Sequence, residues 1–144
     1  MDAWDGYNAE REAIFATARE NKQNLVVLAG DTHNAWASNL KDKQGDIVGV
    51  EFATPSISSP GLESYIGVKP QDYQATEAEY LKMIDDLVYV NMSDRGYMTV
   101  TFTPEKVSSS WHFVSTTSTT NYAENTDRFM QLASIANKPT LVKV

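Results

Sequence analysis

The sequence of 144 residues contains no cysteine, only two histidines and no long apolar run. Without cysteine, the chain forms no disulfide bonds and has neither thiolate metal ligands nor thiol nucleophiles. No stretch approaches the roughly 18 apolar residues that a membrane-spanning helix requires. We therefore expect no membrane partner, and the redox compartment stays undetermined because a cysteine-free chain tolerates either kind.

Positive charge is also scarce, because 12 Lys and Arg residues face 19 Asp and Glu residues and give a net charge of −7. The chain lacks the excess of positive charge that binding to nucleic acids or anionic membranes would require. An acidic chain can still bind a phosphate ester, since bound divalent metals reverse the local field. The length suits one domain, and 42% hydrophobic and 22% charged residues are ordinary for a globular protein.

Hydrophobic periodicity predicts a helix over 7–22, with Asn8 as its N-cap, followed at once by a strand over 25–29. This strand is a continuous apolar run ending at Gly30, which is typical of a central strand buried on both faces. A helix, a short turn and a buried strand form half of an α/β unit. Ligands bind at the carboxyl edge of such sheets, which here carries the polar residues 31–34.

The rest of the chain predicts a mixed α/β (α+β) fold. Further elements are a short helix or turn at 35–40, strands at 47–54 and 88–91, and a helix at 76–87. Alternating residues over 96–103 and 106–115, joined by Pro104 and Glu105, predict a late β-hairpin. The Ser/Thr-rich stretch 115–120 is expected to be exposed, and 127–136 fits a short amphipathic helix.

The clearest candidate site is Gly30-Asp31-Thr32-His33, directly after the first strand. Carboxylate oxygen and neutral imidazole nitrogen both bind divalent and trivalent first-row metals. A strand end fixes the backbone, and Gly30 permits a sharp turn that aims Asp31 and His33 into one cleft. The alternative is that Asp31 caps a following helix while His33 is a polar residue at the rim.

This motif is similar to the Gly-His-x-His signature of calcineurin-like metallophosphoesterases, in the form with Asp as the first ligand. That form is found in the PhoD-like alkaline phosphatase and phosphodiesterase family. Other segments resemble this family in the same order: Trp4-Asp5-Gly6-Tyr7 with Glu10-Arg11, residues 24–31, Trp36, residues 49–52 with 54–59, and Arg95-Gly96-Tyr97. The resemblance extends from Trp4 to about Phe113 and corresponds to the C-terminal portion of the family domain.

The resemblance implies the C-terminal half of a four-layer αββα sandwich, with 1–114 in the domain and 115–144 as a Ser/Thr-rich tail. It also implies metal-dependent hydrolysis of phosphomonoesters and phosphodiesters, iron and calcium being the expected metals, in secreted or periplasmic proteins. Asp31 and His33 would be metal ligands, and His33 is also a candidate acid that protonates the leaving group. The expected partner is a small phosphate ester.

The family's N-terminal metal motifs, two Asp regions and an Asn motif, do not occur in these residues. Two ligands are fewer than the three or more of a catalytic site, so we expect a phosphoric ester hydrolase by family whose site is incomplete here. This chain alone is then expected to be inactive. One alternative is a non-catalytic fragment that forms homo-oligomers through uncovered sheet faces. Another is an unrelated α+β binding module.

Five further residues are candidates for substrate binding: Trp4, Asp5, Arg11, Asn34 and Trp36. The first three also have a simpler, structural interpretation. Asp5 fits a helix cap, Trp4 a core residue, and Arg11 a solvated ion pair with its glutamate neighbours. Asn34 and Trp36 follow the motif closely enough either to contact the substrate or to hold His33. His112, between Trp111 and Phe113, is interpreted as a structural strand residue.

Overall fold

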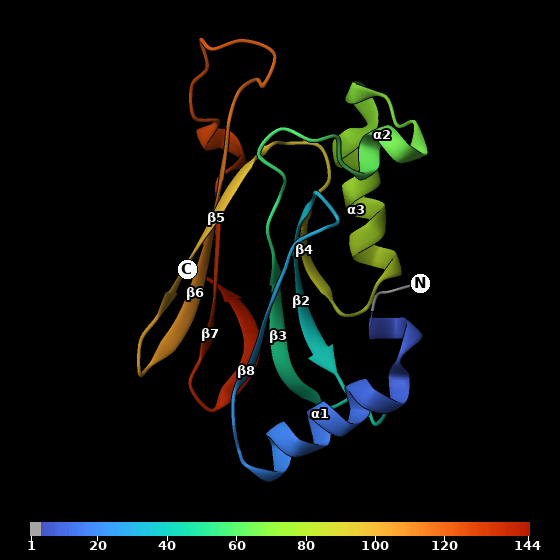
Figure 1. Ribbon diagram of the computed structural model, residues 1–144, viewed down its shortest axis with the longest axis vertical. Coiled ribbons are helices and arrows are strands. Elements are labelled where there is room, and N and C mark those ends of the chain that lie inside the picture. Colours follow the sequence, from blue (N-terminus) through green and yellow to red (C-terminus); the bar gives the residue numbers. More distant parts are fainter. Residues whose placement is uncertain (1–3) are drawn as a thin grey trace.

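The computed structural model describes residues 4–144 as two four-stranded sheets packed face to face (Figure 1). The first sheet has the order β1-β3-β2-β4, with β1 (Leu25–Ala29) parallel to β3 (Ile47–Ala53). Strands β2 (Ala35–Lys41) and β4 (Leu87–Asn91) complete it in antiparallel pairing.

The second sheet is an antiparallel meander in which each strand pairs with the next along the chain. Its strands are β5 (Gly96–Phe102), β6 (Lys106–Phe113), β7 (Met130–Ile135) and β8 (Lys138–Lys143). The first two strands form the predicted hairpin, which is thereby confirmed.

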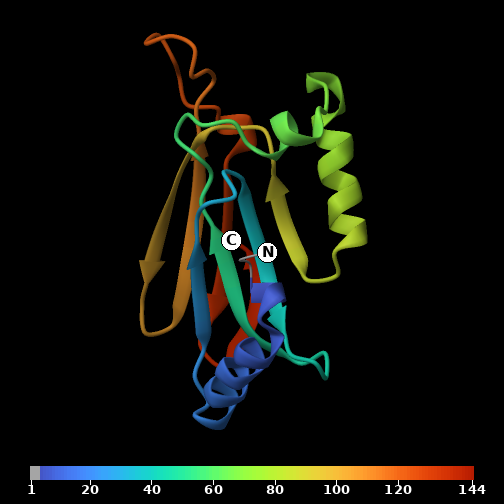
Figure 2. The ribbon, with the colours of Figure 1, turned by 45° about the vertical axis from the view of Figure 1, so that its right-hand side comes forward.

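Helices lie outside the two sheets, at opposite ends of the sandwich (Figures 1 and 2). Helix α1 (Asn8–Glu20) lies at one end, and α2 (Leu62–Ile66) and α3 (Tyr73–Met83) lie beside β4 toward the other end. Three 3-10 turns are η1 (Trp4–Gly6), η2 (Pro70–Asp72) and η3 (Thr126–Arg128). None of the helices in residues 4–144 is both long and apolar enough to cross a membrane. The predicted mixed α/β class is confirmed.

The core lies between the two sheets and is centred on Trp111 of β6, which is fully buried. Its ring lies 5.8 Å from the ring of Phe52 and 5.1 Å from that of Tyr89, both on the first sheet. Trp111 Nε1 also donates a 2.9 Å hydrogen bond to the carbonyl of Ala53. One residue therefore joins the sheets by both apolar packing and a buried polar contact.

Two predictions for the first sheet are wrong. Strand β1 is an edge strand, because within the described chain it pairs only with β3, and the side chain of Leu28 is 53% exposed. A continuous apolar run indicates a buried strand but carries no information about strand order. Residues 35–40 form β2 and not a helix or turn, with Ala35 and Ala37 buried on the inner face.

The helix predicted at 127–136 is also wrong. The segment contains the end of η3 and strand β7, which pairs with β6 on one side and β8 on the other. Residues 130–135 are compatible with helical and strand spacing, and pairing with β6 decides between them. The tail thus contributes two strands to the second sheet. At the first helix, Tyr7 is the N-cap residue in place of Asn8, and no side chain caps it.

Candidate functional site

The turn between β1 and β2 presents the two candidate metal ligands. Asp31 and His33 both have left-handed backbone conformations, with φ of 67° and 60°. We expected Gly30 to provide the bend, but its φ is not positive. The left-handed conformations occur at Asp31 and His33 instead. Asp and His adopt this conformation more readily than most residues, and such strain is concentrated at functional sites. Asp31 is exposed and His33 is half-buried.

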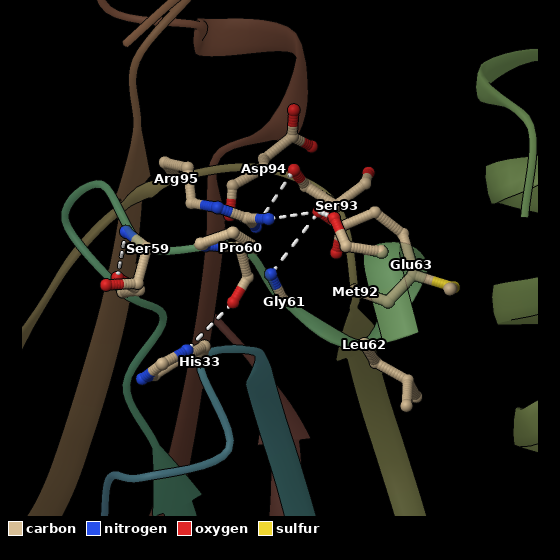
Figure 3. A network of polar contacts seen from close by, with 12 residues as sticks. His33, Ser59, Pro60, Gly61, Leu62, Glu63, Met92, Ser93, Asp94 and Arg95 are labelled. Carbon is tan, nitrogen blue, oxygen red and sulfur yellow. Dashed lines mark hydrogen bonds and ion pairs between the residues drawn. The ribbon is translucent and has the colours of Figure 1, made fainter. Parts of the chain in front are cut away.

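The imidazole of His33 is held by one backbone carbonyl. Its Nδ1 lies 2.8 Å from the oxygen of Pro60, in the loop that follows β3 (Figure 3). A carbonyl only accepts hydrogen bonds, so Nδ1 carries the hydrogen, and Nε2 of the neutral ring keeps its lone pair. This arrangement is the usual one for a metal-binding histidine, in which the second ring nitrogen donates to an outer partner.

The loop that carries Pro60 is fixed by buried contacts on both sides. Asn34 is 2% exposed, and its Oδ1 accepts a 2.8 Å hydrogen bond from the amide of Leu62. A Cβ atom added at Gly61 would lie 2.5 Å from Asn34 Oδ1 and 2.9 Å from the carbonyl of Met92. No side chain fits at this position, because the Asn34 side chain and the Met92 carbonyl lie so close to the backbone. Position 61 therefore requires glycine.

Next to this loop, on the side away from His33, lies a buried ion pair between Glu63 of α2 and Arg95, which precedes β5 (Figure 3). Their exposures are 6% and 9%, and Arg95 Nη2 donates to Glu63 Oε1. The same oxygen accepts the amide of Gly61 at 3.3 Å, while Arg95 Nη1 donates to the carbonyl of Ser93 at 3.0 Å. Sequence reasoning missed Pro60 and Glu63, whereas Arg95 was visible as part of the Arg-Gly-Tyr segment.

A second ionic cluster lies near the same end of the sandwich, beyond the strands. Arg128 of η3 donates to both carboxylate oxygens of Glu77 at 2.8–2.9 Å and to Asp94 at 2.7 Å. Partial burial would lower the pKa of Arg128, but hydrogen bonds and charges from Glu77 and Asp94 outweigh it and raise the pKa. Glu77 also accepts the amide of Met92 at 3.0 Å. The cluster therefore anchors α3 and η3 to the segment that links β4 to β5.

Three of the candidate substrate-binding residues lie elsewhere. Trp4, Asp5 and Arg11 line a cavity of about 270 Å³ with residues 38–41 and Glu51. Asp5 pairs with Arg11, and Trp4 packs edge-to-face on Phe15 at 5.8 Å. The length of β2 separates this cavity from His33 by roughly 15–20 Å, at about 3.3 Å per strand residue.

The other two candidates lie beside His33 in sequence but face different partners. Asn34 is directed inward to Leu62, and Trp36 packs on Tyr80 of α3 with ring centroids 6.1 Å apart. His112 stacks on Tyr97 at 4.9 Å and contacts Glu124 at 2.8 Å on the second sheet. The structure therefore brings together Asp31, His33, the Pro60 loop and the buried Asn34 that fixes this loop, while Trp4, Asp5, Arg11 and Trp36 contact other parts of the molecule.

The donor set at this turn is suited to part of a metal site. Asp31 supplies carboxylate oxygen and His33 an unshared Nε2, both ordinary ligands of iron or zinc. Within residues 4–144, no group of three or more His, Asp or Glu side chains is positioned to hold a metal ion. The described residues thus provide two donors on a rigid, exposed turn.

Comparison with known proteins identifies the family of this chain. The family described as PhoD-like phosphatase matches residues 1–111, so the chain belongs to the PhoD-like phosphatase family. The chain is 37% identical over 111 residues to alkaline phosphatase D of Bacillus subtilis (strain 168), covering 74% of this chain and 18% of that protein. The solved structure of PhoD matches with a TM-score of 0.74 and 25% identity, covering 100% of this chain and 27% of that one.

These matches confirm the predicted family, and they show that the chain corresponds to only part of its relatives. The chain spans about a fifth of the curated relative and about a quarter of the solved chain. The alternative of an unrelated binding module is wrong, because family and fold agree.

Proposed function

We propose that the chain forms part of a metal-dependent phosphoric ester hydrolase and contributes two metal ligands, Asp31 and His33. The observation that carries the proposal is the 2.8 Å contact between His33 Nδ1 and the Pro60 carbonyl. This contact places the ring hydrogen on Nδ1 and so leaves the lone pair of Nε2 available to bind a metal ion. Family membership supports the same chemistry.

The substrates proposed are phosphomonoesters and phosphodiesters, and the metals are iron and calcium. When bound, these ions would neutralise phosphoryl charge and lower the pKa of a water that attacks phosphorus. Asp31 supplies an oxygen ligand and negative charge, and His33 supplies a nitrogen ligand through Nε2. In the alternative role, His33 Nε2 carries a proton and delivers it to the departing alkoxide.

A site of two protein ligands is too small for tight catalytic binding, so we expect no turnover by this chain alone. Activity would require further ligands from outside the 144 residues, in the same polypeptide or a partner chain. Robust metal-dependent hydrolysis of a chromogenic phosphodiester by the purified chain would contradict this expectation.

The ligand assignment is tested by metal binding to His33→Ala, with His112→Ala as the matched control. We expect titration with Fe²⁺, or with Zn²⁺ as a probe ion, to load the wild type and His112→Ala weakly and to leave His33→Ala without metal. His112 is suitable because it is the other histidine of the sequence and lies on the second sheet against Tyr97 and Glu124. Equal metal content in both variants would overturn the assignment.

A second candidate function, a non-catalytic fragment that self-associates, is favoured by one observation. Strand β1 has a free edge within the described chain, and Leu28 on it is 53% exposed. Free strand edges with apolar side chains pair with other chains. The two functions are compatible if the edge receives the remainder of a catalytic domain.

A further inference from the structure

One peptide group connects the imidazole of His33 with a buried carboxylate. The carbonyl of Pro60 accepts from His33 Nδ1 at 2.8 Å, and the amide of Gly61 donates to Glu63 Oε1 at 3.3 Å (Figure 3). Both atoms belong to the Pro60–Gly61 peptide, which is trans like every described peptide bond. In a trans peptide, the N–H and C=O point in opposite directions, so the peptide bridges the two side chains.

We propose that Glu63 is a positioning residue for His33 and acts through the Pro60–Gly61 peptide. Arg95 holds the Glu63 carboxylate in place for this purpose. The significance of the inference rests on the proposed function, in which His33 Nε2 must be free to bind a metal. The proposal assigns a role to two buried residues that touch neither the candidate ligands nor the exposed turn.

The physical basis is polarisation along a chain of hydrogen bonds. A negative charge near the N–H of a peptide group attracts the amide hydrogen. This polarises the peptide group and increases the electron density on the carbonyl oxygen of the same peptide. In a low-dielectric interior, successive bonds strengthen one another by about 10–30% each. The Pro60 oxygen thereby becomes a better acceptor for His33 Nδ1–H, and the tautomer with a free Nε2 is favoured. The arrangement is the counterpart of a direct carboxylate–histidine pair, with one peptide inserted.

The surroundings indicate more than a structural contact. A buried ion pair is a weak source of net stability, because desolvation offsets its attraction. Glu63 Oε2 is buried and has no hydrogen-bond partner within the described chain, so Arg95 does not satisfy the whole carboxylate. A Cβ atom at Gly61 would lie 2.7 Å from this oxygen, which shows how closely the carboxylate approaches the peptide.

The inference is tested first on the metal-free chain, labelled with ¹⁵N. At about pH 8.5, well above the usual histidine pKa of about 6.5, long-range ¹H–¹⁵N spectra report the tautomer of each neutral ring. We expect the wild-type His33 to be in the Nδ1–H form. His112 serves as an internal reference, because its Nδ1 contacts Glu124 on the second sheet. A predominant Nε2–H form of His33 would overturn the proposal without any variant.

The charge is then removed with Glu63→Gln, which retains an oxygen that can accept the Gly61 amide. We expect the Nε2–H form of His33 to gain population while His112 and the control variant Glu79→Gln remain unchanged. If Glu63→Gln fails to fold, Arg95→Lys replaces it, and a smaller gain of the same sign is expected. An unchanged His33 tautomer in a folded variant would contradict the role of Glu63.

Metal titration of the same variants separates this inference from the proposed function. Loss of an outer partner typically weakens metal binding about 10–100-fold, and we expect a loss at the lower end for Glu63→Gln. If the wild-type chain binds neither Fe²⁺ nor the probe ion Zn²⁺ even weakly at high metal concentration, the proposed ligand role of His33 fails, while the tautomer result still decides on Glu63. Wild-type binding that is unaltered by Glu63→Gln would overturn the positioning role alone.

Discussion

At the scale of single residues, the acidic side chains of this protein experience very different surroundings. Glu51 of β3 faces the cavity that also contains Asp5. Burial, with a smaller contribution from the charge of Asp5, raises the pKa of Glu51 above its usual value. Ionised Glu51 is thus less favourable in the folded protein than in the unfolded chain.

This shift predicts that Glu51→Gln is more stable than the wild type at pH 7. The penalty is absent below the unfolded pKa of about 4.3 and develops as the pH rises through the higher folded pKa. The difference between the two urea midpoints is therefore expected to be positive at pH 7 and to disappear toward pH 4. Glu105→Gln, in the exposed turn between β5 and β6, is the control. A difference that is independent of pH would contradict the explanation.

The candidate site shows which residues can be recognised from the sequence and which cannot. Asp31 and His33 are visible because they follow an apolar run at a fixed spacing. Pro60 acts through its carbonyl oxygen, which every residue has, and Glu63 lies 30 residues from His33. Contacts of this kind depend on how loops meet in space, so no local pattern reports them.

At the scale of elements, the contact of Trp111 with the first sheet is the main link between the layers. We expect Trp111→Phe to lower the free energy of unfolding by about 1–3 kcal/mol, since the Ala53 carbonyl loses a buried donor. The aromatic packing against Phe52 and Tyr89 is largely retained. Urea unfolding followed by circular dichroism measures the change, and a loss near zero would show that the hydrogen bond contributes little.

Elements were predictable where periodicity was strong and where local turns define pairing. The β5–β6 hairpin and helix α1 belong to this group. Strands β2 and β7 were not recognised, because their short segments also fit helical spacing, and no element was predicted for β8. They become strands because neighbouring strands offer edges with which to pair. The order of strands was equally inaccessible, since it is fixed by pairing across the molecule.

At the scale of the whole molecule, the sandwich formed by residues 4–144 leaves a free strand edge at β1. We expect the chain to self-associate in a concentration-dependent manner, and Leu28→Lys to shift it toward the monomer, because a charge at a strand edge opposes pairing. Light scattering with size-exclusion chromatography measures the mass. Leu81→Lys is the control, since Leu81 is 41% exposed on α3. A wild-type chain that remains monomeric at high concentration would exclude this association.

The order of pairing in the first sheet also has a consequence for how the chain folds. Strands β2 and β3 are joined by a short loop and pair locally, whereas β1 pairs in parallel with β3, from which β2 separates it in the sequence. Pairing between more distant segments forms more slowly. With one strand neighbour in the described sheet, β1 is expected to open before the central strands β2 and β3, so amide hydrogen exchange should be faster at Val26–Leu28 than at Val50–Phe52. The turn that carries Asp31 and His33 would then be completed late in folding, when its supporting strand finally docks.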